Sequence, residues 1–393
     1  MWGHHENLSR LEGTINMIYG ELSTEEMDRL IPDCCERICD TWLRDTQITV
    51  GRDAYYMTGT SRPDNQPPPG GAVISDGLRI WRSENLYDWQ PLGVVWSLDM
   101  GPAWLRDYRV HWPDGGRCYS PQEYAALSVP VDVPVRRALW APKIHYSPSR
   151  DNFYVVGCMN FNMGLTAERW IGDLFGGCFL LESTTGAAIG PYRVTTDTPL
   201  MHYIDPCLFE DDDGSLIVVW QDGNLARLNN RLDGLLEVDR PWQSHFDIEP
   251  VKEGACLFKH EGRYHLGFSI SAHRQPEGHY SLRHAGHGDR RIPCGYQFVV
   301  ASAESIHGPY GKRYSALVNG GHGCPFQVRG GEWWACVFHP PGHPEMLHKN
   351  GLSGKRTLGP RLVAMRWING QIVPDDARTR TFYKTASGTC KPA

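Results

Sequence analysis

Hydrophobic and polar positions alternate along most of this chain in short runs that are separated by turns. The clearest example is EGACLFKHEGRYHLGFS, from Glu253 to Ser269, in which an apolar run leads into a polar turn that contains Gly262. Beyond this turn, aromatic and aliphatic residues occupy every second position. A period of two on each side of a glycine-containing turn predicts a β-hairpin.

Four other segments repeat this order of strand, turn and aromatic-rich strand. They are TQITVGRDAYYMTGT after Asp45, WAPKIHYSPSRDNFYVVGC from Trp140, IDPCLFEDDDGSLIVVW around Asp205 and HGCPFQVRGGEWWACVF from His322. Because small antiparallel sheets that recur along a chain usually assemble radially, we predict an all-β fold, a five-bladed β-propeller. A β-sandwich is the alternative, but that fold has no reason to repeat one hairpin five times. The blades are expected at about 45–96, 139–196, 204–238, 254–314 and, in two parts, 323–338 with 362–373.

The repeats divide the chain into two parts. Residues 1–42 precede the first copy, and Ser23 followed by Glu26 forms a capping box that predicts the start of a short helix. A second helical piece is expected over Cys34–Trp42. We therefore predict a short helical N-terminal extension over 1–42 and the propeller domain over 43–393.

Charge and composition restrict the partners. The net charge is -6 and Lys and Arg are scattered, which argues against nucleic acid or a membrane surface as partner. No run approaches the ~20 apolar residues of a membrane helix, and the N-terminus lacks a signal-peptide pattern. The twelve Cys include no CxxC pair and slightly favour a reduced compartment. The localisation stays open between cytoplasm and, after removal of a leader, periplasm or exterior, and so does the oligomeric state.

Three carboxylates begin strands of different repeats: Asp45, Asp205 and Glu253. The innermost strands of a propeller all face one axis, so side chains at their starts converge although they are far apart in the sequence. Carboxylates that share a partly buried site repel one another, which separates their pKa values into those of an acid and a base. Hydrolysis of a glycosidic bond requires such a pair. One Asp alone would more often cap a turn, but three comparable acids favour a site.

The motifs, in this order, resemble those of glycoside hydrolase family 43, whose members are five-bladed propellers with inverting arabinofuranosidase, arabinanase or xylosidase activity. The resemblance covers roughly Trp42 to Val373 and rests on RDTQI with AYYMTGT, LWAPKIHY, YIDPCLFEDDDG, EGACLF, and GHGCPF with VFH. It implies that Asp45 is the general base, that Glu253 is the general acid and that Asp205 tunes and orients the acid. It implies no required cofactor, and it places His322 near the axis, beside a possible structural Ca²⁺ or Na⁺.

Two positions depart from the family pattern. Lys143 stands after WAP, where the family usually has an acid, and Thr46 stands where the first catalytic Asp is usually followed by Pro. Trp140, Trp220, Lys143 and Arg361 are candidates for contact with a sugar, because aromatic faces and cations suit that ligand. The two Trp residues suit a hydrophobic core equally well.

The resemblance implies an inverting glycosidase that acts on an oligo- or polysaccharide, with exo-acting release of α-L-arabinofuranosides or related plant or algal side chains as the first choice. A β-xylosidase, a β-galactofuranosidase and an anhydrogalactosidase are alternatives, since loops shape the pocket. Inversion predicts carboxyl groups of Asp45 and Glu253 that lie ~6.5–9.5 Å apart. A carbohydrate-binding propeller without turnover is the alternative of another class, which Lys143 leaves open and the three acids oppose.

Overall fold

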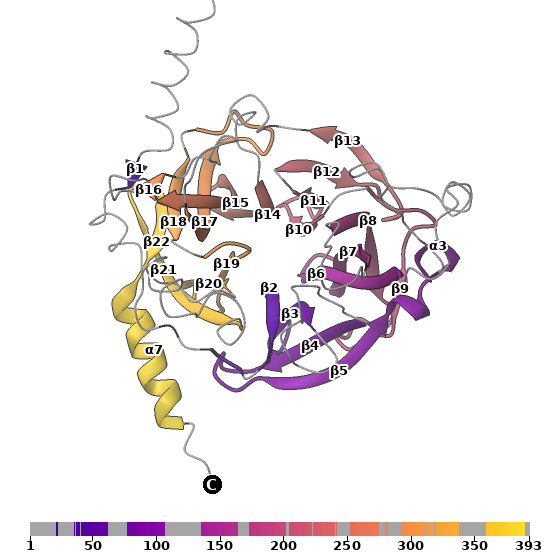
Figure 1. Ribbon diagram of the computed structural model, residues 1–393, viewed down its shortest axis with the longest axis horizontal. Coiled ribbons are helices and arrows are strands. Elements are labelled where there is room, and N and C mark those ends of the chain that lie inside the picture. Colours follow the sequence, from indigo (N-terminus) through magenta and orange to yellow (C-terminus); the bar gives the residue numbers. More distant parts are fainter. Residues whose placement is uncertain are drawn as a thin grey trace, which may run out of the picture.

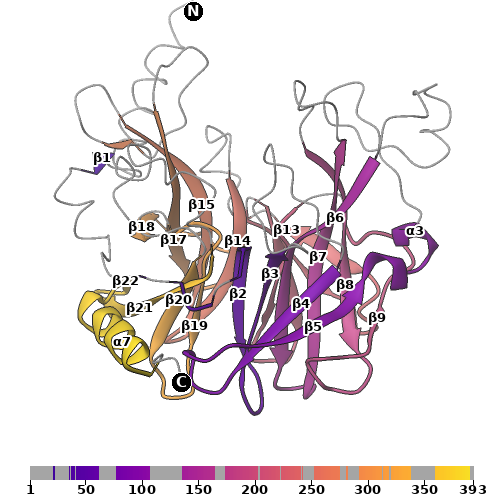
Figure 2. The ribbon, with the colours of Figure 1, turned by 60° about the horizontal axis from the view of Figure 1, so that its bottom comes forward.

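The fold was analysed in a computed structural model of the chain. The structure describes residues 21–22, 35, 37–39, 41–61, 77–106, 135–163, 173–201, 204–221, 223–239, 241, 252–274, 280–281, 292–311, 313–317, 320–337 and 359–389. These residues form five antiparallel sheets around one axis (Figures 1 and 2). The predicted all-β five-bladed propeller is confirmed.

The first three blades each contain four strands in sequence order, with the first strand innermost. Blade one comprises β2 (Leu43–Val50), β3 (Tyr55–Ser61), β4 (Gly77–Ser83) and β5 (Gln90–Ser97), followed by the short helices η2 (Leu98–Met100) and α3 (Ala103–Arg106). Blade two comprises β6 (Val135–Ser147), β7 (Asn152–Met163), β8 (Asp173–Ser183) and β9 (Tyr192–Val194). Blade three comprises β10 (Cys207–Glu210), β11 (Leu216–Trp220), β12 (Asn224–Leu228) and β13 (Leu235–Asp239).

The last two blades follow the same plan, and blade four carries an addition at its edge. Blade four comprises β14 (Lys252–His260), β15 (Arg263–Arg274), β17 (Ile292–Ala303) and β18 (Tyr314–Leu317). The two-residue strands β16 (Tyr280–Ser281) and β1 (Glu21–Leu22) extend it, β16 pairing with β15 and β1 with β16. Blade five comprises β19 (Cys324–Gln327), β20 (Trp333–Val337), β21 (Arg361–Ile368) and β22 (Gln371–Pro374).

The hydrophobic core lies between neighbouring blades. Trp96 of blade one and Phe179 of blade two belong to one buried cluster, with ring centroids 5.3 Å apart. Similar clusters lie between blades two and three, four and five, and five and one. Strands that are packed on both faces are buried at every position, as in LIVVW of β11, whereas the outermost strand β13 is mostly exposed. Apolar side chains between the blades supply the hydrophobic core. Polar side chains can therefore occupy the axis without reducing that core.

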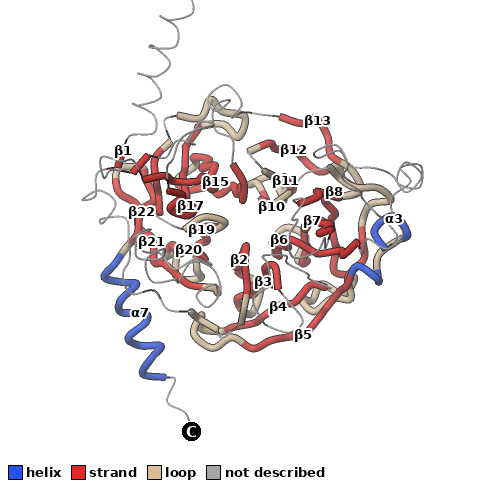
Figure 3. The backbone as a smooth tube through the Cα atoms, in the orientation of Figure 1, coloured by secondary structure: helices blue, strands red, loops and turns tan. Residues whose placement is uncertain are grey.

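A C-terminal helix, α7 (Asp376–Thr389), joins the last blade to the first (Figures 1 and 3). The ring of Phe382 stacks on Tyr87 of blade one at 4.3 Å and lies 5.0 Å from Trp334 of blade five. The hydroxyl of Tyr383 accepts a hydrogen bond from the Leu362 N–H and donates one to the Leu362 carbonyl, both at 2.9 Å. None of the described helices is long and apolar enough to cross a membrane.

The described part of the N-terminal segment is not helical. The helix predicted from Ser23 lies outside the described residues. The second predicted helix, over Cys34–Trp42, is wrong, since its described residues are bends or irregular backbone. The N–H of Ile38 donates to the carbonyl of Pro360 at 2.9 Å, and Cys35 packs against the core between blades five and one. Docking against blade five replaces the local hydrogen bonds that a helix would need.

Replacing Phe382 by Ala should lower the free energy of unfolding by about 3–5 kcal/mol, because this 5% exposed ring contacts both end blades. Equilibrium unfolding in urea measures the change. The exposed neighbour Thr381 is the matched control, and Thr381→Ala should alter stability by no more than about 0.5 kcal/mol. Equal effects of the two substitutions would show that α7 does not hold the ring closed.

Candidate active site

One backbone feature recurs within, or just before, the innermost strand of every blade. A residue with positive φ stands there in each blade: Asp45 (φ 54), Ala141 (φ 43), Asp205 (φ 56), Gly254 (φ 64) and His322 (φ 54). We call these five positions the first axial ring. Residues other than glycine seldom adopt this left-handed conformation, and where they do the site is often functional. In three blades the pairing register shifts at this point, and such bulges aim a side chain away from the regular pleat.

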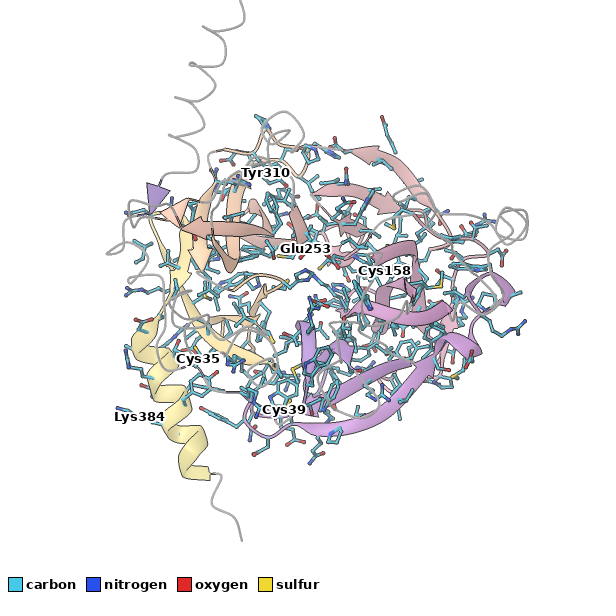
Figure 4. The ribbon with its side chains drawn as sticks, in the orientation of Figure 1. Cys35, Cys39, Cys158, Glu253, Tyr310 and Lys384 are labelled. Atoms are coloured by element: carbon cyan, nitrogen blue, oxygen red, sulfur yellow. The ribbon has the colours of Figure 1, made fainter. Side chains whose placement is uncertain are left out.

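The three predicted acids meet at this ring. Asp45 and Asp205 occupy left-handed positions, whereas Glu253 stands one residue before Gly254. Its label in Figure 4 lies near the centre of the propeller. The repeats suggested that the three acids occupy equivalent positions. The structure shows instead that Glu253 lies one residue earlier in its blade than Asp45 and Asp205 do in theirs. The side chain of Glu253 is 19% exposed, compared with 7% for Asp45 and 5% for Asp205.

His322 lies at the centre of the acids. Its Nδ1 is 3.4 Å from Oδ1 of Asp45, and its Nε2 is 3.5 Å from Oδ2 of Asp205 and 3.3 Å from Oε1 of Glu253. The imidazole is 4% exposed. One buried ring thus contacts acids from three other blades, with Asp45 on one edge and Glu253 on the other.

Hydrogen bonds between blades hold Asp45 in place. The hydroxyl of Thr60 donates to Oδ2 of Asp45 at 2.7 Å and accepts from the N–H of Ala141 at 2.8 Å. Ala141 belongs to blade two, whereas Thr60 and Asp45 belong to blade one. The orientation of the carboxylate therefore depends on how these two blades are seated against each other.

The other members of the site are fixed in the same way. The N–H of Gly254 donates to Oδ2 of Asp205 at 3.1 Å, which joins blades four and three. The N–H of His322 donates to Oγ of Ser269 at 2.5 Å, which joins blades five and four. A Cβ at Gly254 would lie 3.0 Å from Cγ of His322 and 3.1 Å from Oγ of Ser269. Position 254 therefore needs glycine for its close contacts as well as for its φ.

The two buried groups at the centre have shifted pKa values. Burial raises the pKa of Asp205 to about 6; Glu253 and Asp45 add to this rise and His322 opposes it. Burial alone would lower the pKa of His322, but Asp205, Asp45 and the hydrogen bond with Glu253 raise it to about 9. At neutral pH the site therefore contains an imidazolium that is surrounded by carboxyl groups.

Ligand atoms of Asp205, Glu253 and His322 lie within 4.8 Å of one another, a spacing that a metal ion can bridge. A metal binds the neutral form of histidine through a free nitrogen lone pair. Here each ring nitrogen faces a carboxyl group, and in the absence of a metal ion these groups raise the pKa of His322. The Ca²⁺ or Na⁺ expected near His322 stays a prediction.

The four residues predicted to contact sugar lie in different surroundings. Trp220 is 2% exposed within the core between blades two and three, and Arg361 is 6% exposed and donates to the carbonyl of Gly359 at 2.9 Å. Lys143 is 1% exposed. Only Trp140 is partly exposed, and it precedes its left-handed residue just as Glu253 does. Trp140 thus holds the position in blade two that Glu253 holds in blade four, and sugar contact by all four side chains stays a prediction.

Sequence reasoning missed two hydroxyl residues that orient the site, Thr60 at Asp45 and Ser269 at His322. Thr60 lies in AYYMTGT and Ser269 ends the segment that starts at Glu253, so both were inside recognised repeats. Each is a small hydroxyl residue of the second strand that pairs with the innermost strand beside the first axial ring. A search for hydroxyl residues opposite the acids in each hairpin would have found them.

A five-bladed propeller with three carboxyl groups at its axis belongs to the class of propellers that are suited to acid and base catalysis on a sugar. The family model described as "Glycosyl hydrolases family 43" matches residues 38–370. The chain belongs to this family.

Solved structures of the family share the fold. A GH43 protein from Bacillus licheniformis is 19% identical, with a TM-score of 0.56 over 87% of this chain and 56% of that one. For a xylan β-1,4-xylosidase from Bacillus halodurans the values are 19%, 0.54, 87% and 56%. An endo-1,4-β-xylanase from Bacteroides thetaiotaomicron is 19% identical, with a TM-score of 0.50 over 87% of this chain and 96% of that one. The chain thus spans little more than half the length of the first two structures. No curated protein matches it.

The raised pKa of His322 predicts a pH-dependent stability. Because the folded pKa, about 9, exceeds the ordinary value of 6.5, the stabilising contribution is complete below pH 6.5 and is lost as the pH rises through 9. The pKa of Asp205 is about 6, so the stabilities of wild type and variant are compared above that value, between pH 6.5 and 9. The melting midpoint of wild type should exceed that of His322→Asn most at pH 6.5 and least above pH 9.

Asn is chosen because it tolerates a positive φ. The control is His307→Asn, at an exposed histidine that pairs with Asp239 on the surface. A difference between wild type and His322→Asn that does not change over this pH range would contradict the assignment of an imidazolium.

Proposed function

We propose that this protein is a glycosidase that hydrolyses its substrate by single displacement with inversion. Glu253 donates a proton to the leaving glycosidic oxygen, and Asp45 removes a proton from the attacking water on the other face of the sugar. Asp205 orients Glu253 and raises its proton affinity. The observation that carries the proposal is the convergence of the three carboxyl groups on the single imidazole of His322.

The exposure of the three acids supports this division of roles. Glu253 is the most exposed of them, as a group that reaches the leaving oxygen must be. Asp205 is held by the N–H of Gly254 and faces His322, so it acts through its neighbours and not on the substrate. Asp45 has Oδ2 fixed by Thr60 and Oδ1 facing Nδ1 of His322, and these contacts orient the carboxylate that is proposed to activate the water.

The positions of Asp45 and Glu253 favour inversion. They contact opposite nitrogens of one imidazole, at 3.4 and 3.3 Å, so the width of the ring separates the two carboxyl groups. An inverting enzyme needs space for a water between acid and base, whereas carboxyl groups of a retaining enzyme lie only ~5 Å apart. His322 in this position keeps the acid and the base from closing to that shorter spacing.

The proposed substrate is a pentoside at the end of a polysaccharide side chain. An exo-acting α-L-arabinofuranosidase is the first candidate among the activities of the family whose motifs the five blades resemble. A β-xylosidase is the second candidate, because structural neighbours of the chain are described as a xylan β-1,4-xylosidase and an endo-1,4-β-xylanase. Trp140, partly exposed at the position in blade two that Glu253 holds in blade four, is the proposed platform for the sugar ring.

Replacing Glu253 by Gln should reduce kcat by roughly 10²–10⁴-fold, because the side chain keeps its shape but loses the proton that it transfers. The assay is release of para-nitrophenol from the α-L-arabinofuranoside, β-xyloside and β-galactofuranoside. The control is Glu304→Gln, at a carboxylate whose side chain is 79% exposed, and it should retain wild-type rates.

Hydrolysis of one glycoside that is lost in Glu253→Gln would identify both the sugar and the acid. Equal rates for Glu253→Gln and wild type would refute the mechanism. Wild-type protein that binds the glycosides in calorimetry without hydrolysing them would instead favour a carbohydrate-binding propeller.

A further inference from the structure

A second ring of side chains lies on the axis next to the first. Two residues after each left-handed position, the innermost strands carry Gln47, Lys143, Cys207, Cys256 and Cys324. We call these five residues the second axial ring. These residues follow the first axial ring on the same innermost strands. All five residues are at most 6% exposed.

Contacts between blades link most members of the second axial ring. Nε2 of Gln47 in blade one lies 3.8 Å from Sγ of Cys207 in blade three. The thiol of Cys324 in blade five contacts the thiols of both Cys207 and Cys256. Four of the five side chains are thus linked to one another by contacts between blades.

Lys143 is the one cation in this ring. Its Nζ is buried and makes no hydrogen bond to any of the described residues. A buried ammonium group without a counter-charge is costly. Its neighbours in the second axial ring are thiols and an amide, and the acid that interacts with it is Asp205 of the first axial ring. Burial disfavours the charged form of Lys143, and the carboxylate of Asp205 favours it.

The charges of the two rings balance when they are counted together. With Glu253 protonated, a step that rests on the proposed function, the first axial ring holds two carboxylates and one imidazolium. The ammonium of Lys143 supplies the second positive charge. The amide and thiols of the remaining members add none at neutral pH, because burial and contact with other thiols raise the pKa of Cys207 and Cys324.

We propose that the ammonium of Lys143 is the central cation of this propeller. The chain itself thus supplies a fixed counter-charge to Asp205. Lys143 is therefore a positioning residue, which acts on the substrate only through the carboxyl groups above it. The substitution that departs from the family pattern then has a defined role, and that role is electrostatic rather than sugar contact.

The sign of one stability change separates this proposal from a simpler account. If Lys143 were only a polar group trapped in the core, the isosteric Lys143→Met would relieve its desolvation and raise the melting midpoint. If Lys143 is the counter-charge, Lys143→Met leaves buried carboxylates unbalanced and lowers the midpoint by about 5 °C or more at pH 7. A midpoint that rises or does not change would overturn the proposal.

Chemical rescue tests the charge itself. Lys143→Ala leaves a cavity of the size of propylammonium, which should raise the melting midpoint and kcat of this variant, whereas propanol of the same length should not. The control is Cys256→Ala, which removes volume from the same ring without removing charge and should not respond to propylammonium. Equal rescue by propanol, or none by the amine, would overturn the proposal.

Wild-type protein supplies a test that needs no variant. Its melting midpoint should be unchanged by millimolar Ca²⁺ or by EDTA, because the central cation is part of the chain. A midpoint that Ca²⁺ raises and EDTA lowers would overturn the proposal. The melting experiments need no substrate, so they decide the role of Lys143 even if no glycoside is hydrolysed.

Discussion

The repulsion among three carboxyl groups in one buried space is the constraint on which the rest of this structure depends. The imidazole of His322 offsets this repulsion directly, since oxygens of Asp45, Asp205 and Glu253 all lie within 3.5 Å of its two nitrogens. The groups come from four blades, and hydrogen bonds through Thr60 and Ser269 pass from one blade to the next. The propeller therefore positions the site only while its blades stay packed against one another.

Much of the fold could be predicted because a hairpin is a local structure. Strand period and turn residues appear directly in the sequence, and the five expected blades match the observed strands. The predicted helix over Cys34–Trp42 failed for the opposite reason, since the hydrogen bond from Ile38 to Pro360 joins positions that are distant in the sequence. Local propensity could not reveal a partner more than three hundred residues away.

The site was predictable in composition but not in arrangement. The acids could be named because each follows a motif, yet the left-handed residues Asp45, Ala141 and His322 share no side-chain chemistry. Their common feature is a backbone conformation that a single sequence does not display. The depth of a side chain is also hidden, so Lys143 suggested a sugar contact and proved to be 1% exposed. Burial changes the expected partner of its ammonium group from a sugar to a carboxylate.

The configuration of the first product tests the central claim most directly. The account holds that Glu253 and Asp45, on opposite edges of His322, act on opposite faces of the sugar with one water between them. Proton NMR of the anomeric signal during the first minutes of hydrolysis distinguishes the possible outcomes. Inversion of the anomeric configuration is the predicted result. Retention would require a covalent intermediate and a much closer pair of carboxyl groups, and it would contradict the account.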